Sequence, residues 1–219
     1  MSHPFVVILL GPPGVGKGTQ ATKIHQKLNL PHISTGDILR ANIKAQTPLG
    51  LQTQNIIAKG ELVPDNLVDT MLMQRLEQKD CRKGFILDGY PRTLSQAHTL
   101  ENLLDPKASL HIFLYEAKEA TIVTRISGRL VCKNCGQVFH KTFKPPKVHN
   151  LCDGCSQELS QRKDDQEDVV LERLKIYKKT IDPVVQFYKQ KHLLHTISCE
   201  GTIEDAFSQT LHYLHKAPL

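Results

Sequence analysis

A glycine-rich loop near the start of the sequence has the residue types and spacing of a phosphate-binding site. It reads GPPGVGKGT from Gly11 to Thr19, follows the apolar run Phe5–Leu10 and leads into a segment with helical periodicity. Glycines allow backbone N–H groups to converge on a phosphate, the helix N-terminus adds positive charge, and Lys17 supplies a point charge for the outer phosphates. A plain glycine turn with a solvated lysine is disfavoured, because a strand precedes the loop and a helix follows it.

An acidic residue at the end of a second apolar run could serve the metal of such a site. Gly18 occupies the place where the general loop pattern has a hydroxyl on magnesium, and Thr19 comes one residue late, so direct metal contact by that threonine is not expected. Asp88 follows the run Phe85–Leu87, and nucleotide-bound Mg²⁺ needs a carboxylate at a strand end, directly or through water. We therefore predict that Asp88 organises Mg²⁺. The alternative is a turn-forming role, since Asp-Gly is common in turns.

Four of the six cysteines form two Cys-x-x-Cys pairs separated by the sixteen residues 136–151. This spacing fits a Cys₄ zinc site, in which two thiolates from each turn close a tetrahedron and leave no open position. We therefore predict a structural Zn²⁺ ion. An iron–sulfur cluster ranks second, and a redox dithiol ranks lower because two such pairs would have to occur in one small segment. The predicted ligands are Cys132, Cys135, Cys152 and Cys155, while Cys81 and Cys199 are expected to be ordinary packing thiols.

Apolar runs that alternate with helical patterns must position these groups. Such alternation predicts an α/β fold of three layers around a five-stranded parallel sheet, because near-continuous apolar runs are typical of strands buried on both faces. The predicted strands are Phe5–Leu10, His32–Ser34, Phe85–Leu87, Leu110–Leu114 and His195–Ser198.

Helices are predicted from apolar residues at three- and four-residue spacing and from their start signals. Thr93 with Gln96, and Thr202 with Asp205, have capping-box spacing, and Asp182-Pro183 has the pattern of an N-cap followed by proline at the first helical position. The apolar faces are expected to be core; they comprise Val68, Leu72 and Leu76; Ala97, Leu100 and Leu104; Val170, Leu174 and Tyr177; and Ile203, Phe207, Leu211 and Leu214.

Two segments interrupt this pattern and predict inserts in one core. Residues 34–63 have the pattern of a small helical insert with two helices, split by Pro48 and Gly50. Residues 128–165 hold the paired cysteines and show little helical periodicity, which predicts a metal-binding insert. The phosphate-loop core would then consist of residues 1–33, 64–127 and 166–219.

Charge and composition exclude several classes of protein. The 219 residues carry a net charge of +6, which favours anionic partners, but residues 128–165 hold seven Lys or Arg against four Asp or Glu, a weak field for a polyanion surface. The longest apolar run is too short to cross a bilayer, and the first residues lack the features of a signal peptide. We expect a cytoplasmic protein with no membrane and no nucleic-acid partner.

Five motifs in their order and spacing together resemble the adenylate kinase family, and the resemblance spans nearly the whole chain. The cysteine-bearing segment further resembles the long, zinc-binding lid found in part of that family. The motifs are Gly11–Gln20, Thr35–Arg40 (TGDILR), Asp88–Thr93 (DGYPRT), Gly128-Arg129 and Arg162–Asp165 (RKDD). The resemblance implies a P-loop fold and the reaction ATP + AMP ⇌ 2 ADP with Mg²⁺, catalysed by a monomer.

The resemblance also implies a role for each matching position. Glu61 stands where the bacterial pattern often has lysine. The implied catalytic groups are Lys17, Arg40, Arg92, Arg129, Arg162, Arg173 and Asp88. The implied AMP-binding residues are Thr35, Arg40, Glu61, Leu62, Val63, Gly89, Arg92, Gln96, Arg162 and Arg173. The implied ATP-binding residues are Gly14, Val15, Gly16, Lys17, Gly18, Thr19, Arg125, Arg129, Val138, Phe139 and Ile203.

The expected chemistry needs cations more than a general base. Phosphoryl transfer depends on positioning and on positive charge aimed at the equatorial oxygens, a task that suits arginine. An acceptor phosphate has a second pKa of about 6 and is mostly ionised at neutral pH, so none of the eleven histidines is predicted to be catalytic. Two alternatives remain open: a related kinase for UMP, CMP or GMP, and, more remotely, a zinc-ribbon NTPase that binds nucleic acid.

Overall fold

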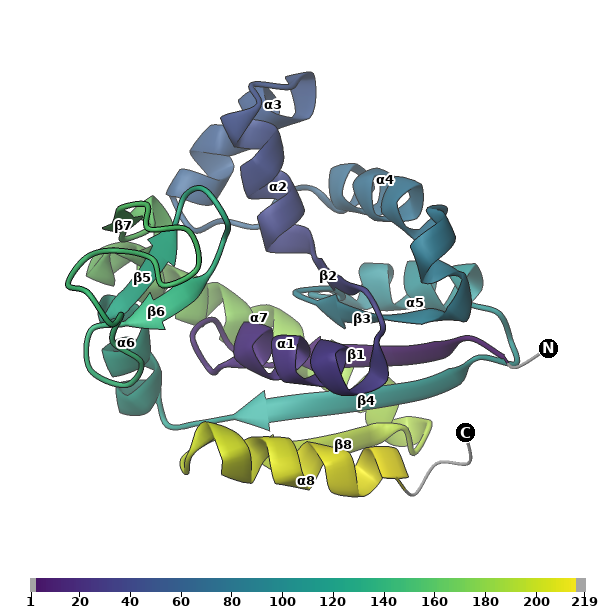
Figure 1. Ribbon diagram of the computed structural model, residues 1–219. Coiled ribbons are helices and arrows are strands. Elements are labelled where there is room, and N and C mark those ends of the chain that lie inside the picture. The colour runs from purple at the N-terminus through teal and green to yellow at the C-terminus, as the bar shows by residue number, and fades with distance from the viewer. Residues whose placement is uncertain (1–2, 216–219) are drawn as a thin grey trace.

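A five-stranded parallel sheet forms the centre of the computed structural model, with the strand order β2-β3-β1-β4-β8 (Figure 1). The α/β class and the five predicted strands are confirmed, with boundaries that differ by at most two residues. The strands are β1 Phe5–Leu10, β2 His32–Ser34, β3 Gly84–Asp88, β4 Ser109–Glu116 and β8 Leu194–Ser198. The structure describes residues 3–215, so positions 1–2 and 216–219 of the predicted core lie outside the described residues.

Helices cover both faces of this sheet and produce the three layers. Alternate residues of β1 point to opposite faces, so Ile8 belongs to one apolar cluster and Leu9 to the other. The first cluster includes residues of α4 Asp65–Leu76, α5 Leu94–Leu103 and α7 Glu167–Gln190, and the second includes residues of α1 Lys17–Leu28 and α8 Ile203–His215. Two short 3₁₀ helices, η1 Lys79–Lys83 and η2 Lys163–Asp165, lie before β3 and before α7.

Residues 35–58 fold as two helices beside the sheet, α2 Thr35–Lys44 and α3 Pro48–Ala58. Thr47 is the N-cap of α3, and its side chain accepts a hydrogen bond from the backbone N–H of Gly50 at 3.1 Å. Pro48 takes the first helical position. The predicted break at Gly50 is wrong, because Gly50 lies inside α3. A Cβ at Gly50 would come within 2.2 Å of the Asn42 carbonyl oxygen, so the glycine permits close packing of α3 on α2.

Residues 129–160 contain a small antiparallel sheet of order β6-β5-β7, which the sequence patterns did not predict. Its strands are β5 Arg129–Cys132, β6 Val138–His140 and β7 Leu159–Ser160. The segment follows α6 Glu119–Ser127, a helix for which no start or periodicity was identified. Its buried core consists of Cys132, Phe139, Cys152 and Leu159.

Two of the three predicted helix starts are confirmed and one is wrong. Thr93 accepts from the Gln96 N–H at 3.2 Å, and Thr202 and Asp205 exchange hydrogen bonds in a complete capping box. Pro183, in contrast, lies inside the 24-residue α7.

The continuity of α7 through proline follows from burial on both sides of it. An interior proline costs about 3 kcal/mol, whereas burying a large apolar side chain contributes about 1.5–3 kcal/mol. Ile181, Val184, Val185 and Tyr188 are all buried in the core around this position. Their combined contribution exceeds the cost, so the helix does not end at Pro183. Among residues 3–215, no helix has the length and hydrophobicity needed to cross a bilayer.

Candidate active site

The phosphate loop connects β1 to α1 and leaves the first turn of the helix open to an anion. Gly16, the N-cap residue, has φ 113° and no side chain to cap the helix, and the first turn contains no acidic residue. Gly14 has φ +77°, and a Cβ there would come within 2.2 Å of Ile126, so this position requires glycine. The free N–H groups of the first turn can therefore bind a phosphate.

Lys17 is folded back over this loop. Its Nζ donates to the carbonyl oxygens of Gly11 at 2.8 Å and Pro12 at 2.9 Å. Burial lowers the pKa of Lys17 to about 8, the nearby Asp88 carboxylate opposes that change, and the arginines around it add to the lowering. A phosphate placed in the loop would compensate this positive charge.

Asp88 lies at the carboxyl end of β3, beside both the loop and β2. In the parallel register it pairs with Leu9 of β1 and Ser34 of β2. His32 Nε2 lies 3.5 Å from Asp88 Oδ2. Burial alone would raise the pKa of Asp88, but His32 and the positive charge of Lys17 outweigh this effect, so the pKa lies below its ordinary value. Asp88 is therefore an ionised carboxylate next to the phosphate loop.

Five arginines come together from separate elements, and four of them, Arg40, Arg129, Arg162 and Arg173, lie within ion-pair distance of Asp37 or of the buried Asp164 and Asp165. Arg129 forms a two-point ion pair with Asp165. Arg173 Nη1 lies 3.0 Å from Asp164 Oδ2 and 3.5 Å from Asp165 Oδ1. These two acids are 7 % and 1 % exposed. The charge of Arg173 and its neighbours lowers the pKa of Asp164, although burial alone would raise it.

The acids leave part of this positive charge uncompensated. Among residues 3–215, no carboxylate lies within ion-pair distance of Arg92, whose Nε instead donates to the Gly89 carbonyl at 2.7 Å. Desolvation by the surrounding groups of the cleft, together with the charge of Arg173, lowers the pKa of Arg92 to about 10. Lys17 and the five arginines thus give six cationic side chains, and the acids placed among them are four: Asp37, Asp88, Asp164 and Asp165. The site is thus prepared for an additional polyanion.

A cavity beside the arginines contains nine of the ten residues predicted for AMP. Arg162 is not among its lining residues; its guanidinium lies 3.5 Å from Asp37. Gln96, at the start of α5, lines the cavity and is 3 % exposed. The nine are Thr35, Arg40, Glu61, Leu62, Val63, Gly89, Arg92, Gln96 and Arg173.

The residues predicted for ATP lie in two places. Six of them form the loop and the start of α1: Gly14, Val15, Gly16, Lys17, Gly18 and Thr19. Arg125 donates to the carbonyl oxygens of Val15 at 3.2 Å and Cys199 at 2.8 Å, and the Ile203 carbonyl accepts from Gln20 at 3.0 Å. The other place is β6, where Phe139 is 2 % exposed and packs in the cysteine-bearing core, while Val138 is 37 % exposed. Because the side chain of Phe139 is buried in this core, this residue could contact a ligand only through its backbone.

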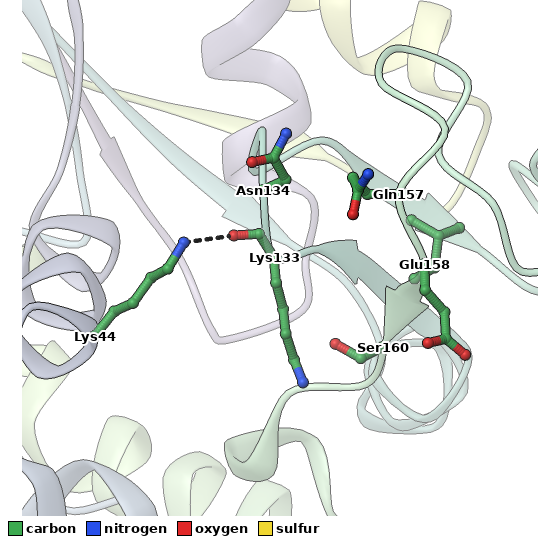
Figure 2. Close-up of a pocket in the computed structure, with 7 residues that line it drawn as sticks. Lys44, Lys133, Asn134, Gln157, Glu158 and Ser160 are labelled. Atoms are coloured by element: carbon green, nitrogen blue, oxygen red, sulfur yellow. Dashed lines mark hydrogen bonds between the residues drawn. The ribbon is translucent and has the colours of Figure 1, made fainter.

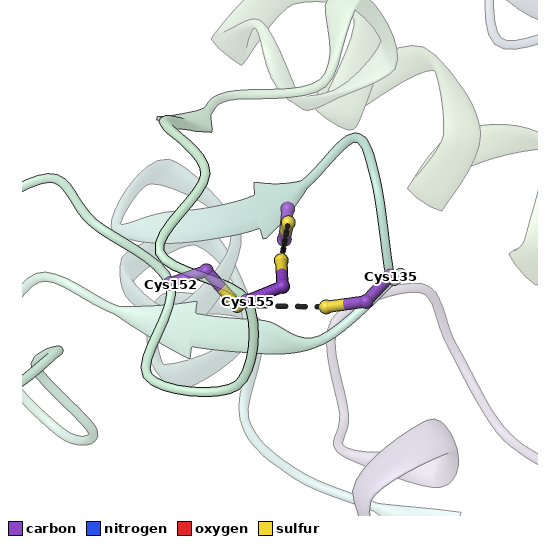
Figure 3. A group of neighbouring side chains, drawn as sticks. Cys135, Cys152 and Cys155 are labelled. Atoms are coloured by element: carbon purple, nitrogen blue, oxygen red, sulfur yellow. Dashed lines mark hydrogen bonds between the residues drawn. The ribbon is translucent and has the colours of Figure 1, made fainter.

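The four paired cysteines converge at one end of the small sheet (Figure 3). Their Sγ atoms all lie within 4.8 Å of one another, with 3.4 Å between Cys132 and Cys155 and 3.5 Å between Cys135 and Cys152. Four sulfurs about 2.3 Å from a tetrahedral ion would be about 3.8 Å apart. None of the four forms a disulfide. The donor set and the spacing fit a closed metal site.

The cysteine-bearing segment also contacts the helical segment (Figure 2). Lys44, at the end of α2, donates from Nζ to the Lys133 carbonyl at 3.1 Å, and this contact borders a cavity of about 420 Å³. Gln157, Glu158 and Ser160 line its other side. The ion pair of Arg162 with Asp37 is a second contact between the segments.

Sequence reasoning missed the acidic partners of the arginines. Asp37, Asp164 and Asp165 stand inside quoted motifs, yet no roles were assigned to them. A pair of adjacent acids directly after Arg162-Lys163 was the available signal. The sequence does not reveal that both acids are buried, and burial is what makes an ion pair with arginine necessary. Asp65, which binds Gln96, carried no distinguishing local pattern.

Comparison with known proteins finds similarity over most of the chain. A family model described as "Adenylate kinase" matches residues 9–193. A protein from Methanocella arvoryzae named adenylate kinase is 48 % identical over 200 residues, which cover 90 % of this chain and 93 % of the relative. Adenylate kinases from Clostridium novyi and Thermosipho melanesiensis are 46 % and 42 % identical, covering 92 % and 96 % of this chain and 94 % and 99 % of the relatives.

Proposed function

This chain belongs to the adenylate kinase family, and we propose that its cleft catalyses the reversible transfer of the γ-phosphoryl group of ATP to AMP, with two ADP as products. The enzyme is a phosphotransferase with a phosphate group as acceptor. The observation that carries the proposal is the excess of cationic side chains between the phosphate loop and the cavity lined by Gln96. Two nucleotides that meet end to end would place their phosphates among these cations.

ATP would bind on the loop side. Backbone N–H groups of Gly14, Gly16 and Gly18 would hold its phosphates, and Lys17 would turn from the Gly11 and Pro12 carbonyls toward them. Arg125, already held over the loop by Val15 and Cys199, would lie against the adenine. Val15, Thr19, Val138, Phe139 and Ile203 would complete this side.

AMP would bind in the cavity lined by Thr35 and Gln96. Arg92 is suited to its phosphate, because its guanidinium lines this cavity and has no carboxylate partner among the described residues. Arg40 would contact the same phosphate. Glu61, Leu62, Val63 and Gly89 line the space expected for the nucleoside.

Arg129, Arg162 and Arg173 would stabilise the charge that develops on the transferred group. Their links to Asp164, Asp165 and Asp37 hold these guanidinium groups in place before the substrates arrive. The acceptor phosphate has a second pKa of about 6, so its attacking oxygen is already ionised at neutral pH. No general base is needed, and catalysis consists of alignment and charge stabilisation.

Asp88 fits the role of organising Mg²⁺ with ATP, because it is ionised and adjacent to the loop. Bound Mg²⁺ would neutralise phosphate charge. A Cβ on Gly18 would lie 3.6 Å from Asp88 Oδ2, so the missing hydroxyl leaves room beside the carboxylate, and contact through water suits this space.

Zn²⁺ is our proposal for the cysteine site, on the basis of its four thiolates and closed geometry. It would be structural, since four protein ligands leave no position for a substrate. Residues 128–165 would then be a zinc-binding lid over ATP, and residues 34–63 a cover over AMP that excludes water during transfer. Unpaired thiols suit a reducing compartment, so we propose a cytoplasmic enzyme. We further propose a monomer that acts on ATP, AMP and ADP without nucleic acid.

A coupled assay tests the function by offering ATP and Mg²⁺ with AMP, GMP, CMP or UMP in turn. We expect AMP to be the preferred acceptor. Lys17→Ala should lower kcat at least about 100-fold, because one preorganised cation on the transferred group is lost. The matched control is Lys23→Ala, in the same helix, whose Nζ pairs with Glu204 on the surface. Equal loss in both variants, or a preferred acceptor other than AMP, would refute the assignment.

A further inference from the structure

The side-chain amide of Gln96 is held at both ends. Its Nε2 donates to Asp65 Oδ1 at 2.7 Å, and its Oε1 accepts from the backbone N–H of Arg92 at 2.8 Å. A carboxylate only accepts and a backbone N–H only donates. The oxygen and nitrogen of this amide are therefore not interchangeable, although the side chain lines a cavity where a ligand could otherwise reorient it.

Asp65 is well placed to keep this arrangement. It lies in the first turn of α4, beside the start of α5, where these helices are neighbours in Figure 1. Its second oxygen accepts from the Thr93 hydroxyl at 2.7 Å, and the same hydroxyl oxygen accepts from the Gln96 N–H at 3.2 Å. One carboxylate thus fixes the helix cap and the side chain of Gln96 together.

A fixed amide can distinguish two purines of the same shape. An amide offers two N–H groups and two lone pairs, and the internal bonds leave one of each for a base. Adenine presents an amino donor at C6 next to an acceptor at N1, whereas hypoxanthine presents an oxygen acceptor at C6 next to an N1–H donor. An amide that could flip would suit both bases, but a locked amide suits one.

We propose that Asp65 is a positioning residue that locks the Gln96 amide and thereby selects a 6-amino purine over a 6-oxo purine at the monophosphate site. This inference rests on the proposed function, in which Gln96 faces the base of AMP. With the wrong base, two donors or two acceptors would face each other in a buried site, and such mismatches are strongly disfavoured.

The test compares AMP with inosine monophosphate as acceptors, with ATP as donor. In Asp65→Ala we expect the ratio of kcat/KM for AMP to that for inosine monophosphate to fall at least about tenfold, with the KM of ATP changed less than about twofold. A ratio that stays within about twofold of wild type would overturn the inference. A general loss of structure would affect ATP as well, so the split between substrates separates positioning from stability.

Asp69→Ala is the matched control. Asp69 lies one turn further along α4, and its carboxylate accepts from the buried hydroxyl of Tyr90 at 2.7 Å. This variant removes a comparable bond without touching Gln96, so the ratio should remain at its wild-type value. If Asp65→Ala does not fold, Asp65→Asn replaces it. The amide introduced by Asp65→Asn can present either an oxygen or an amino group to Gln96, so the ratio should fall about threefold or more, and an unchanged ratio would count against the lock.

Gln96→Ala separates this inference from the proposed function. If Gln96 faces the base, Gln96→Ala should lower the ratio at least as far as Asp65→Ala, and adding Asp65→Ala to it should cause no further fall. An unchanged ratio in Gln96→Ala would show that the assigned place of the base is wrong. A fall in Gln96→Ala without a fall in Asp65→Ala would refute the role of Asp65 alone.

Discussion

The sheet core and the cysteine-bearing segment differ in how much apolar surface they bury. The core buries its apolar side chains on both faces of β1, β3 and β4, and residues such as Phe113 and Ile86 are completely inaccessible. In the segment 128–165, two of the four buried core residues are cysteines, and Phe143 and Val148 are 61 % and 59 % exposed. The core can fold by apolar burial, whereas the segment buries little, and we expect the proposed metal to stabilise it.

This difference would suit the proposed lid, which has to open and close over ATP. With the proposed metal bound, residues 128–165 would keep their shape when they move away from the core, because their stability would not depend on packing against the sheet. The ion pairs between Arg129 and Asp165 and between Arg173 and Asp164 lie where the two regions meet. Charged contacts of this kind can be exchanged for contacts with phosphates at little cost in apolar burial.

Metal removal should produce the largest contrast between the regions. Structural zinc contributes about 10 kcal/mol or more of apparent binding free energy in small metal domains, so a chelator should unfold residues 128–165. We expect limited proteolysis to cut there rapidly, while far-UV circular dichroism retains the helical signal of the core. Cys135→Ser should behave like the chelated protein, and Cys199→Ser should keep its metal. Loss of the whole helical signal on chelation would contradict independent stabilisation.

Removing one buried ring from each region sharpens the same contrast. Phe113→Ala should lower the free energy of unfolding by about 3–5 kcal/mol, because it opens a cavity in the packed sheet. Phe139→Ala should lower the free energy of core unfolding by less than about 1 kcal/mol but accelerate metal loss, since Phe139 packs with Cys132 and Cys152. Urea titration and a colorimetric zinc-release assay measure the two effects. Equal losses of core stability would mean that both regions unfold as one unit.

The charge of Lys17 should also make the free energy of unfolding of the core depend on pH. The pKa of Lys17 is about 8 in the fold against 10.5 when exposed, so between these values the unfolded chain binds more protons. Stability of the nucleotide-free protein should therefore rise with pH, by up to about 2 kcal/mol from about pH 8 to about pH 9.5 relative to Lys17→Met. Denaturant titration at each pH tests this. A difference that stays flat or falls would show that Lys17 is not destabilised by burial.

The sequence was sufficient for features that depend on local spacing. The phosphate loop, the four cysteines, the five strands and the caps at Thr93 and Thr202 are all encoded within a few residues. Features that depend on tertiary packing were missed. Pro183 stays inside α7 because distant core residues stabilise the helix, and Gly50 stays inside α3 because it packs on Asn42.

The same limit applies to the site. Arg40, Arg92, Arg129 and Arg162 stand in quoted motifs and Arg173 was assigned by resemblance, whereas the pairing of Asp164 and Asp165 with arginine follows from their burial, which no spacing reports. Asp164 and Asp165 follow Arg162 in the sequence, but Asp165 pairs with Arg129, whose strand begins the segment. The bond between Asp65 and Gln96 joins two helices and has no signal in either one.

The smallest expected effect concerns the contact between the two segments at Lys44. Its Nζ bonds to the Lys133 carbonyl at 3.1 Å, but the side chain is exposed, and exposed polar contacts contribute about 1 kcal/mol or less. Lys44→Ala should therefore change the KM of AMP and of ATP less than about twofold, as should Lys59→Ala, a change of another exposed lysine in the helical segment. The arginines of the site would then account for closure. A rise above about fivefold in Lys44→Ala alone would mean that direct contact between the segments, and not their shared contact with phosphates, stabilises the closed site.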